Sequence, residues 1–411
     1  MNEKSLIPAI RFAGFADAWE RRKLGDIAVF NPKEDLPNEF EYVDLESVVG
    51  IEMLSHRLET KQSAPSRAQR LARKGDLFYQ MVRPYQKNNF LFEKDEENYV
   101  FSTGYAQIRP SVNGYFVLSL VQGEKFTNTV LDNCTGTSYP AINANDLASI
   151  EVYVPTGSKE ACVVGHIFRT IDRLITLHQR KHEKLLHIKK SMLDKMFPKD
   201  GELFPEVRFA GFTAAWERRK LFDNIQKITD FRGRTPKKLG MEWSSDGYLA
   251  LSALNVKNGY IDYSEDAHYG SQELYDKWMS GNELHQGQVL FTTEAPMGNV
   301  AQVPDGKRYI LSQRTIAFEV KDNMITENFL AVLLRTPHVF SSLTSMSSGG
   351  TAKGISQKLL ATVEVIMPGV IDEQNAIATL FLNLDHLITL HQRKLEKLQN
   401  IKKACLEKMF V

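Results

Sequence analysis

The sequence predicts a mixed α/β protein in which two globular bodies stand in a pseudo-twofold arrangement and are joined by two long antiparallel coiled-coil helices. The first observation is a repeat, because RFAGFADAWERRKL at 11–24 returns as RFAGFTAAWERRKL at 208–221 with twelve of fourteen residues unchanged. The second is a later block in which 19 of 26 positions agree from Asp172 and Asp385 onward. The third is a set of short β-rich runs between the blocks. The chain is therefore two copies of one unit.

The repeat also sets the domain boundaries. A chain of 411 residues is too long for one ordinary hydrophobic core, so two domains or a little more are expected. We predict a first body at 1–158, a first spacer helix at 159–198, a second body at 199–371 and a second spacer helix at 372–411. The copies are offset by 197 residues at the first block and by 213 at the second, so the second copy carries 16 extra residues in its interior.

The two spacer helices follow from periodicity and from the lack of helix breakers. Between Glu160 and Phe197 the only glycine is Gly165, there is no proline, and apolar residues recur with 4-3 spacing. A helix of this length spans ~55 Å, whereas a compact body of ~150 residues has a radius of gyration of only ~15 Å. The second body begins where the first helix ends and finishes where the second helix starts. Antiparallel pairing brings those two points together and is therefore expected.

Composition excludes several classes of protein. The net charge of +1 gives no global basic signature, so a nucleic-acid surface would have to be local or shared with a partner. No apolar stretch approaches the length of a membrane span, and we expect a cytoplasmic protein. The three cysteines, Cys134, Cys162 and Cys405, lack the spacing of a disulfide framework or a zinc site.

Catalytic and metal-binding motifs are not recognisable. Asn31-Pro32-Lys33 lacks the aromatic residue that an amino-methyltransferase would use to hold a flipped adenine. His178 and His182 have i, i+4 spacing, but their copies are His391 and Leu395, so a repeated metal site is not expected. We predict no catalytic residue, no metal site and no cofactor bound by this chain.

The order of body, helix, body and helix resembles a known family. An RFxGFxxxWExxKL opening and an LDxLIxLxQRKLExLxxxKKxxLxKMF helix together resemble the specificity subunit of type I restriction-modification systems over essentially the whole chain. The resemblance implies that the bodies are target recognition domains, each reading one half of a bipartite asymmetric DNA site. TDFRGRTPKKLGMEW in the second body resembles the early segment of many such domains, whereas FNPKEDLPNEFEY in the first departs from it, which implies different half-sites.

The resemblance also implies the partners and their chemistry. The subunit itself would be non-catalytic, and its repeated helices would set the spacing and dock two modification (methyltransferase) subunits that use S-adenosylmethionine. Restriction (translocase/endonuclease) subunits would add ATP- and Mg²⁺-dependent chemistry. Two alternatives remain open: a bivalent coiled-coil protein-protein adaptor without DNA binding, and a self-contained methyltransferase that would have to bind the cofactor alone.

Candidate DNA-binding residues lie in the two bodies, because Arg and Lys contact phosphates or guanine and Asn or Gln can pair with adenine. Spacing at 67, 70 and 74 is also typical of the solvated face of an amphipathic helix. The segment SGGTAKGIS at 348–356 is interpreted as a flexible turn near DNA or a simple connector. The candidates are Arg67, Arg70, Arg73, Lys74, Arg83, Tyr85, Gln86, Lys87, Asn88, Arg232, Arg234, Lys237, Lys238, Asn299, Arg308, Gln313 and Arg314.

Candidate partner-binding residues lie in the first repeated block. Two near-identical surfaces favour two copies of one partner, whereas two unlike bodies favour unlike ligands or one asymmetric ligand. For any single residue, packing inside the fold is the alternative. The candidates are Arg11, Phe12, Phe15 and Trp19 with their copies Arg208, Phe209, Phe212 and Trp216.

Overall fold

A computed structural model describes residues 6–136, 138–199, 201–347 and 353–411. The chain divides into two compact units, of which unit 1 is formed by 1–179 together with 392–411, and unit 2 by 180–391. Each unit therefore contains one globular body and parts of both long helices, α4 (Ser158–Lys195) and α9 (Ile371–Lys408). The predicted bodies, 1–158 and 199–371, leave out these helical parts.

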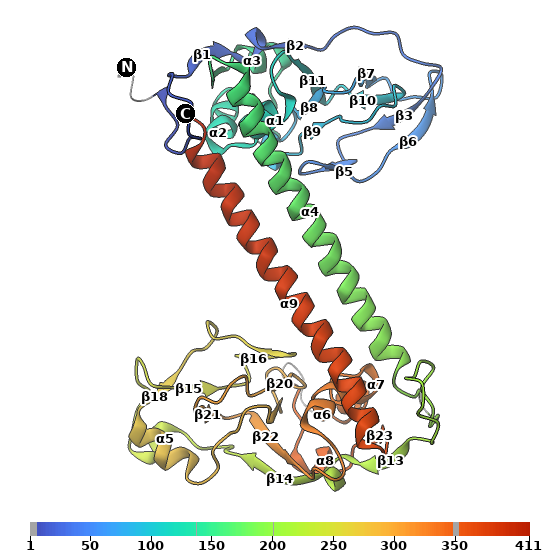
Figure 1. Ribbon diagram of the computed structural model, residues 1–411, viewed down its shortest axis with the longest axis vertical. Coiled ribbons are helices and arrows are strands. Elements are labelled where there is room, and N and C mark those ends of the chain that lie inside the picture. Colours follow the sequence, from blue (N-terminus) through green and yellow to red (C-terminus); the bar gives the residue numbers. More distant parts are fainter. Residues whose placement is uncertain (1–5, 137, 200, 348–352) are drawn as a thin grey trace. The chain divides into compact units, whose positions relative to one another are not determined.

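Unit 1 contains two four-stranded sheets with the orders β2-β11-β8-β9 and β6-β3-β10-β7, and the two-stranded pairs β1-β12 and β4-β5 (Figure 1). Three short helices, α1 (Gly114–Gln122), α2 (Glu124–Asp132) and α3 (Ala144–Ser149), accompany them. The strands are β1 (Glu20–Lys23), β2 (Ala28–Phe30), β3 (Glu39–Val43), β4 (Val48–Val49), β5 (Glu52–Met53), β6 (Arg57–Thr60), β7 (Ala68–Leu71), β8 (Leu77–Gln80), β9 (Phe90–Leu91), β10 (Tyr99–Ser102), β11 (Tyr105–Pro110) and β12 (Glu151–Val154).

Unit 2 repeats this plan with a four-stranded sheet of order β14-β22-β19-β20, a three-stranded sheet of order β18-β15-β21, and the pairs β13-β23 and β16-β17. Its short helices are α5 (Gln272–Met279), α6 (Glu327–Leu333), α7 (Pro337–Met346) and α8 (Gln357–Leu360). The strands are β13 (Glu217–Lys220), β14 (Ile225–Asp230), β15 (Tyr248–Leu251), β16 (Val256–Lys257), β17 (Tyr260–Ile261), β18 (Tyr269–Gly270), β19 (Val289–Thr292), β20 (Val300–Gln302), β21 (Ile310–Leu311), β22 (Thr315–Val320) and β23 (Glu364–Met367).

The repeated sequence blocks form the same framework in both units. In unit 1, β1 pairs antiparallel with β12, and Glu20 lies opposite Val154. In unit 2, β13 pairs with β23 in the same register, with Glu217 opposite Met367. The glycine that precedes the central strand also recurs, because Gly75 has φ +96° and Gly287 has φ +90°, a conformation that side chains with a Cβ rarely adopt. The repeated blocks of the two units therefore share backbone geometry as well as sequence.

The two long helices pair antiparallel within each unit. In unit 1, Lys402 Nζ near the end of α9 lies 2.6 Å from Asp172 Oδ1 in the first half of α4. In unit 2 the roles are exchanged, and Lys189 Nζ near the end of α4 lies 2.5 Å from Asp385 Oδ1 in α9. In both units the early part of one helix meets the late part of the other, which confirms the antiparallel prediction. The helix ends differ from the predicted ones by one to three residues.

Aromatic side chains join the end of a long helix to the globular body. In unit 1 the Phe410 ring lies 6.1 Å from the Trp19 ring and 5.7 Å from the Phe168 ring, measured between centroids. In unit 2 the Phe197 ring lies 5.7 Å from Trp216 and 6.2 Å from Phe381. Phe197 and Phe410, which directly follow the helix ends, therefore pack in or against the hydrophobic cores.

The chain entering each body is hydrogen-bonded to the end of a long helix in the same way. In unit 2, where the chain is continuous, the Val207 N–H donates to the Lys195 carbonyl at 2.9 Å. In unit 1, the Ile10 N–H donates to the Lys408 carbonyl, also at 2.9 Å. We call these two contacts the junction hydrogen bonds.

Candidate nucleic-acid interface

Three loops of unit 2 leave the same end of the sheet that contains β14, β22 and β19. Strand β14 ends at Asp230 opposite Ile316, and β19 ends at Thr292 opposite Thr315, the first residue of β22. The loops 231–240, 293–299 and 312–314 therefore lie together. Gly354 joins them through a β-bridge with Glu294, whereas 348–352 of the predicted SGGTAKGIS turn lie outside the described residues. This set of segments is called the unit 2 loop end.

The unit 2 loop end brings together most of the candidates predicted for the second body. Arg232, Lys237 and Lys238 are exposed on the first loop, and Arg314 is exposed at the start of β22. Arg314 Nε lies 2.9 Å from Glu294 Oε1, and both side chains of this ion pair are more than 45% exposed. This end of the sheet carries more cationic than anionic side chains, as a phosphate-binding surface requires.

Three other candidates in unit 2 have structural contacts. Arg234 donates to the Trp278 carbonyl and stacks 4.3 Å from the Phe231 ring centroid, and Gln313 donates to the Arg234 carbonyl. The Asn299 amide donates to the Val256 carbonyl at 2.9 Å. These side chains hold the loops in place. Arg308 precedes β21 in the other sheet, outside the loops that form the unit 2 loop end, and its guanidinium lies 5.7 Å from the Tyr275 ring.

Unit 1 has an equivalent loop end, which contains the predicted segment 83–88. Here β8 ends at Gln80 opposite Tyr105, the first residue of β11. A β-bridge between Val82 and Ala141 takes the place of the bridge between Glu294 and Gly354 in unit 2. The loop 81–89, the turn 103–104 and the segment 138–142 therefore meet, and we call them the unit 1 loop end.

Two candidates in loop 81–89 brace it against its neighbours. Lys87 Nζ lies 2.7 Å from Glu124 Oε1 and donates to the Gln122 carbonyl at 3.2 Å. Asn88 Oδ1 accepts the Gly50 N–H at 2.8 Å, which ties the loop to the β4-β5 turn. Tyr85 remains 50% exposed, and Arg83 lies over the ring of Tyr139, which is 64% exposed. Tyr139 was missed by sequence reasoning, because a lone Tyr in a turn carries no recognisable signal.

The predicted basic cluster at 67–74 is not one surface. Arg70 lies in strand β7 and the other three residues flank it; because β7 pairs antiparallel with β10, the helix alternative is wrong. Arg67 lies at the unit 1 loop end, where its carbonyl accepts the Thr103 N–H at 2.8 Å, whereas Arg73 and Lys74 follow the opposite end of the strand. Arg73 Nε lies 2.7 Å from Glu34 Oε2, and Lys74 Nζ lies 2.6 Å from Asp95 Oδ1.

Arg70, in the middle of β7, is half-buried. Burial lowers the pKa of its guanidinium, and its Nε has no hydrogen-bond partner within the described part of the chain. The cations at 67–74 thus divide between an exposed end residue, a half-buried side chain and two ion-paired residues.

The comparisons with known proteins place this architecture in a family. A family model described as the type I restriction modification DNA specificity domain matches residues 215–400. In unit 1, β1 and β12 repeat the register that β13 and β23 have within that segment. The second copy thus matches the DNA specificity domain, and the chain is similar to specificity subunits of type I restriction-modification systems.

Individual relatives agree with this assignment. The type I restriction enzyme MjaVIII specificity subunit of Methanocaldococcus jannaschii is 23% identical over 81% of this chain and 73% of its own length. The HindI specificity subunit of Haemophilus influenzae is 22% identical over 44% of this chain and 40% of its own length. The crystal structure of a type I system S subunit from M. genitalium has a TM-score of 0.60 at 14% identity, covering 98% of this chain and 99% of that one, and so shares the fold.

The candidate partner-binding residues of this chain fall into two groups. Arg11 donates two hydrogen bonds to Glu160, at 2.6 and 2.7 Å, and Arg208 donates two to Glu373, at 2.6 and 2.8 Å. Trp19 and Trp216 are 2% and 1% exposed. The expectation that these two tryptophans contact a partner needs correction, because a side chain in the core cannot reach a protein on the surface.

The remaining members of that set are accessible to different degrees. Phe12, Phe15 and Phe212 are partly buried, and Phe209 is 37% exposed. Partner contact by these four residues stays a prediction.

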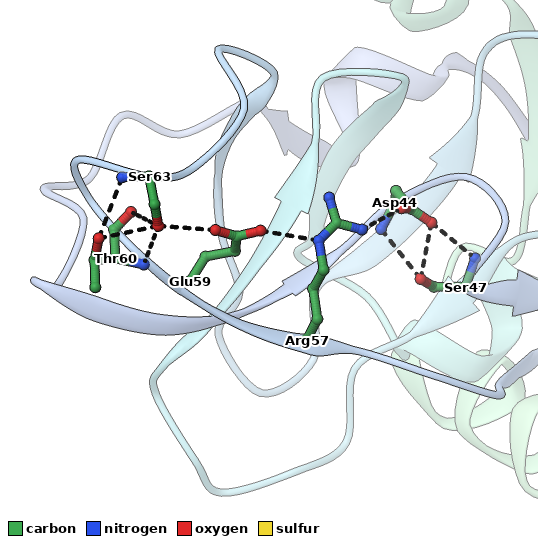
Figure 2. Close-up of polar contacts among 6 residues, drawn as sticks. All are labelled: Asp44, Ser47, Arg57, Glu59, Thr60 and Ser63. Carbon is green, nitrogen blue, oxygen red and sulfur yellow. Dashed lines mark hydrogen bonds and ion pairs between the residues drawn. The ribbon is translucent and has the colours of Figure 1, made fainter.

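A further polar network, in the β6-β3-β10-β7 sheet of unit 1, joins Arg57 to two carboxylates. Figure 2 shows Arg57, which donates to Asp44 at 2.8 Å and to Glu59 at 2.9 Å, and the hydrogen bonds of Ser47 and Ser63 to the same carboxylates. Burial of Asp44 opposes ionisation, but the hydrogen bonds from Ser47 and Arg57 outweigh it and hold the pKa of Asp44 below its ordinary value.

The described ranges contain no group of three or more His, Cys, Asp or Glu side chains that could hold a metal ion. Cys134, Cys162 and Cys405 are free thiols, and burial raises the pKa of Cys134 and Cys405. None of the helices in this part of the chain is long and apolar enough to cross a membrane.

Proposed function

We propose that this chain selects the DNA sequence for a type I restriction-modification complex, with each loop end reading one half of a bipartite asymmetric site in double-stranded DNA. The observation that carries the proposal is the contrast within the repeat. The framework strands keep the same register in both units, whereas the loops at the equivalent sheet ends carry different residues. A common framework with unlike loops suits two readers of unlike half-sites.

The charges at the loop ends support contacts with both backbone and bases. Arg232, Lys237 and Lys238 of unit 2 are exposed and suit phosphate contacts, which supply affinity but no sequence information. Arg314 is placed where β22 begins and could exchange its carboxylate partner for a base edge. In unit 1, Arg67 and Arg83 take these two roles.

Two copies of a modification subunit are the partners that the repeat favours. Leu174 and Leu387 occupy equivalent positions on α4 and α9 and are 38% and 40% exposed. Arg21 and Arg218 pair with Glu151 and Glu364 on equivalent strands, with about half of each arginine side chain exposed, at 50% and 49%. Identical exposed groups on otherwise diverging units suit two identical partners.

The chemistry then belongs to those partners. S-adenosylmethionine would bind to the modification subunits for adenine methylation, and ATP and Mg²⁺ to restriction subunits for translocation and cleavage. This chain would supply sequence choice and assembly.

The first experiment measures DNA association of the complex assembled from this chain and its modification subunits. We expect the logarithm of the association constant to fall linearly with the logarithm of salt concentration, with a slope of about −0.9 for each phosphate contacted. A complex that assembles but shows no DNA association would instead favour the adaptor alternative.

The second experiment tests half-site ownership in cells. Replacing residues 25–155 by the corresponding body of another family member should change one half of the methylated motif and leave the other half intact. If both halves change together, the two units are not independent readers.

A further inference from the structure

We propose that Arg83, supported by Tyr139, reads a guanine in the half-site recognised by unit 1. The inference rests on the proposed function and goes beyond it by assigning one base contact to one pair of side chains. Tyr139 was not among the residues expected to approach DNA.

The backbone around Arg83 is held in an unusual conformation. Arg83 is a non-glycine residue in the left-handed region, with φ 54° and ψ 55°, which costs conformational energy and persists only where the surroundings enforce it. Its N–H donates to the Pro140 carbonyl at 2.8 Å, and its carbonyl accepts the Gln86 N–H at 3.0 Å. The position is therefore defined on both sides, by the segment 138–142 and by its own turn.

The side chain of Arg83 is oriented by an aromatic surface. Its guanidinium carbon lies 4.5 Å from the centroid of the Tyr139 ring, and that ring is 64% exposed. Stacking restricts the guanidinium plane but uses none of its N–H donors. A planar fork whose donors remain available matches the O6 and N7 acceptors that guanine presents in the major groove.

The charge environment distinguishes Arg83 from neighbouring candidates. Arg73, Lys74 and Lys87 are each within 2.7 Å of a carboxylate oxygen, so a DNA contact would first have to break an ion pair. Among the residues that the structure describes, no carboxylate forms an ion pair with Arg83 or with Arg67. Arg67 is exposed and has no stacking partner among the described side chains, which suits a sequence-independent phosphate contact instead.

The equivalent position in unit 2 lacks this group. Ala295 follows the β-bridge residue Glu294 as Arg83 follows Val82, it has the same left-handed conformation with φ 50°, and a proline comes next in both units. The left-handed residue and the following proline are thus kept, although the Ala295–Pro296 peptide bond is cis, while the guanidinium is not. We therefore expect the guanine read by Arg83 to have no counterpart at the corresponding place in the other half-site.

The test uses the complete complex with its modification subunits and a set of DNA duplexes in which each base pair of the unit 1 half-site is varied. Methylation of each duplex is measured for the unaltered protein, for Arg83→Asn, which tolerates the left-handed conformation, and for Arg83→Lys, which keeps the charge without the fork. We expect Arg83→Asn to lose discrimination at a single G·C pair by about 5-fold to about 160-fold, the range of a bidentate contact. Arg83→Lys should lose most of it as well.

Three further variants separate reading from support and from charge. Tyr139→Phe should retain the base preference because the ring remains, whereas Tyr139→Ala should weaken it at the same base pair. Arg67→Ala should lower binding to all duplexes alike and reduce the salt slope by about 1. In every variant the preference for the unit 2 half-site should stay unchanged.

Preservation of the full base preference in Arg83→Asn would overturn the assignment. An equal loss at every position of both half-sites, accompanied by a lower melting temperature, would overturn it too, because it would indicate a structural role. If the unaltered complex shows no sequence preference at all, the proposed function itself fails, and the two failures are thus distinguishable.

Discussion

At the scale of single residues, the buried ion pair between Arg11 and Glu160 connects the entering chain to the first turn of α4. The Arg11 and Glu160 side chains are 11% and 4% exposed, and their hydrogen bonds raise the pKa of the guanidinium. The same pair recurs between Arg208 and Glu373, where Trp216 Nε1 adds a hydrogen bond to the carboxylate at 3.2 Å. This repeated ion pair explains why Arg11 and Arg208 of the repeated block point into the fold.

We expect Glu160→Gln to lower the free energy of unfolding by about 3 kcal/mol, because it leaves a buried guanidinium without its counter-charge. Denaturant unfolding monitored by tryptophan fluorescence measures the change. Glu151→Gln is the matched control, since its partner Arg21 lies 3.2 Å away and both side chains are at least half exposed, at 50% and 54%. That variant should cost less than about 1 kcal/mol, and equal losses in the two variants would contradict the structural role assigned to the buried pair.

From the network in Figure 2 we predict that part of the free energy of unfolding depends on pH. The pKa of Asp44 is lower in the folded protein than its ordinary value of about 4, so its ionised form stabilises the fold at higher pH. This contribution is lost as the pH falls through the lowered pKa. Unfolding free energies of the unaltered protein and of Asp44→Asn, measured between pH 7 and pH 3, should therefore converge towards the acidic end. A difference that stays constant over this range would count against the assignment.

Residue-level errors in the sequence interpretation have a physical cause. An arginine beside aromatic residues has the same letters whether it meets a partner or a carboxylate 149 positions away, as Arg11 meets Glu160. Arg73 is likewise neutralised by Glu34, which is 39 positions distant. Long-range pairing of this kind leaves no local pattern, so the buried and ion-paired candidates could not be separated from the exposed ones before the fold was known.

At the scale of elements, the crossing of α1 and α4 depends on one glycine. A Cβ at Gly165 would lie 2.2 Å from Asn113 Oδ1 and 2.9 Å from the Phe116 nitrogen, and these two atoms form the N-cap hydrogen bond of α1. The corresponding position in α9, 213 residues later, is Ala378, which is 1% exposed. The close approach is thus a property of unit 1.

Gly165→Ala should lower the melting temperature even though alanine is the better helix former by about 1 kcal/mol. The reason is that overpacking of a tight contact costs about 1–3 kcal/mol, and here the cap would also have to move. Gly157→Ala, directly before α4, serves as control because its Cβ would have no atom within 4 Å. A Gly165→Ala variant that melts at a higher temperature than the parent would show that the cap relaxes freely.

Long elements were more predictable than short ones. The α4 and α9 patterns persist over about ten turns, so periodicity and the lack of proline identify them, and the predicted ends miss by only one to three residues. Strand β7 has four residues, and at that length the spacing of Arg67, Arg70 and Lys74 fits a helix equally well. Pairing with β10 decides between the two, and pairing is a non-local property.

At the scale of the whole molecule, the internal repeat predicted the two-copy organisation, and the length of the helices relative to the bodies predicted the antiparallel helix pairs. It did not predict that the compact units cut across both helices, because the 1–179 segment needs 392–411 to complete its core. Met409, which is 3% exposed, packs with Trp19 and Phe116 in that core. Unit 1 is therefore built from two segments that lie far apart in the sequence.

The junction hydrogen bonds have a consequence for the order in which the two copies can be encoded. Phe197 and Leu203 are separated by five residues in unit 2, and a direct fusion of Val411 to Met1 would separate Phe410 from Leu6 by six, nearly the same length of chain. A circular permutant closed at this fusion and reopened between Gly201 and Glu202 should fold, bind its partners and direct their methylation to the parental motif, as melting and methylation mapping would report. Reopening between Ile316 and Ala317, inside β22, is the control and should abolish folding. Loss of the parental motif in the first permutant alone would mean that the new ends disturb unit 2. Success would mean that recognition of the two half-sites does not depend on which copy comes first in the chain. A gene for such a protein could then start in either copy.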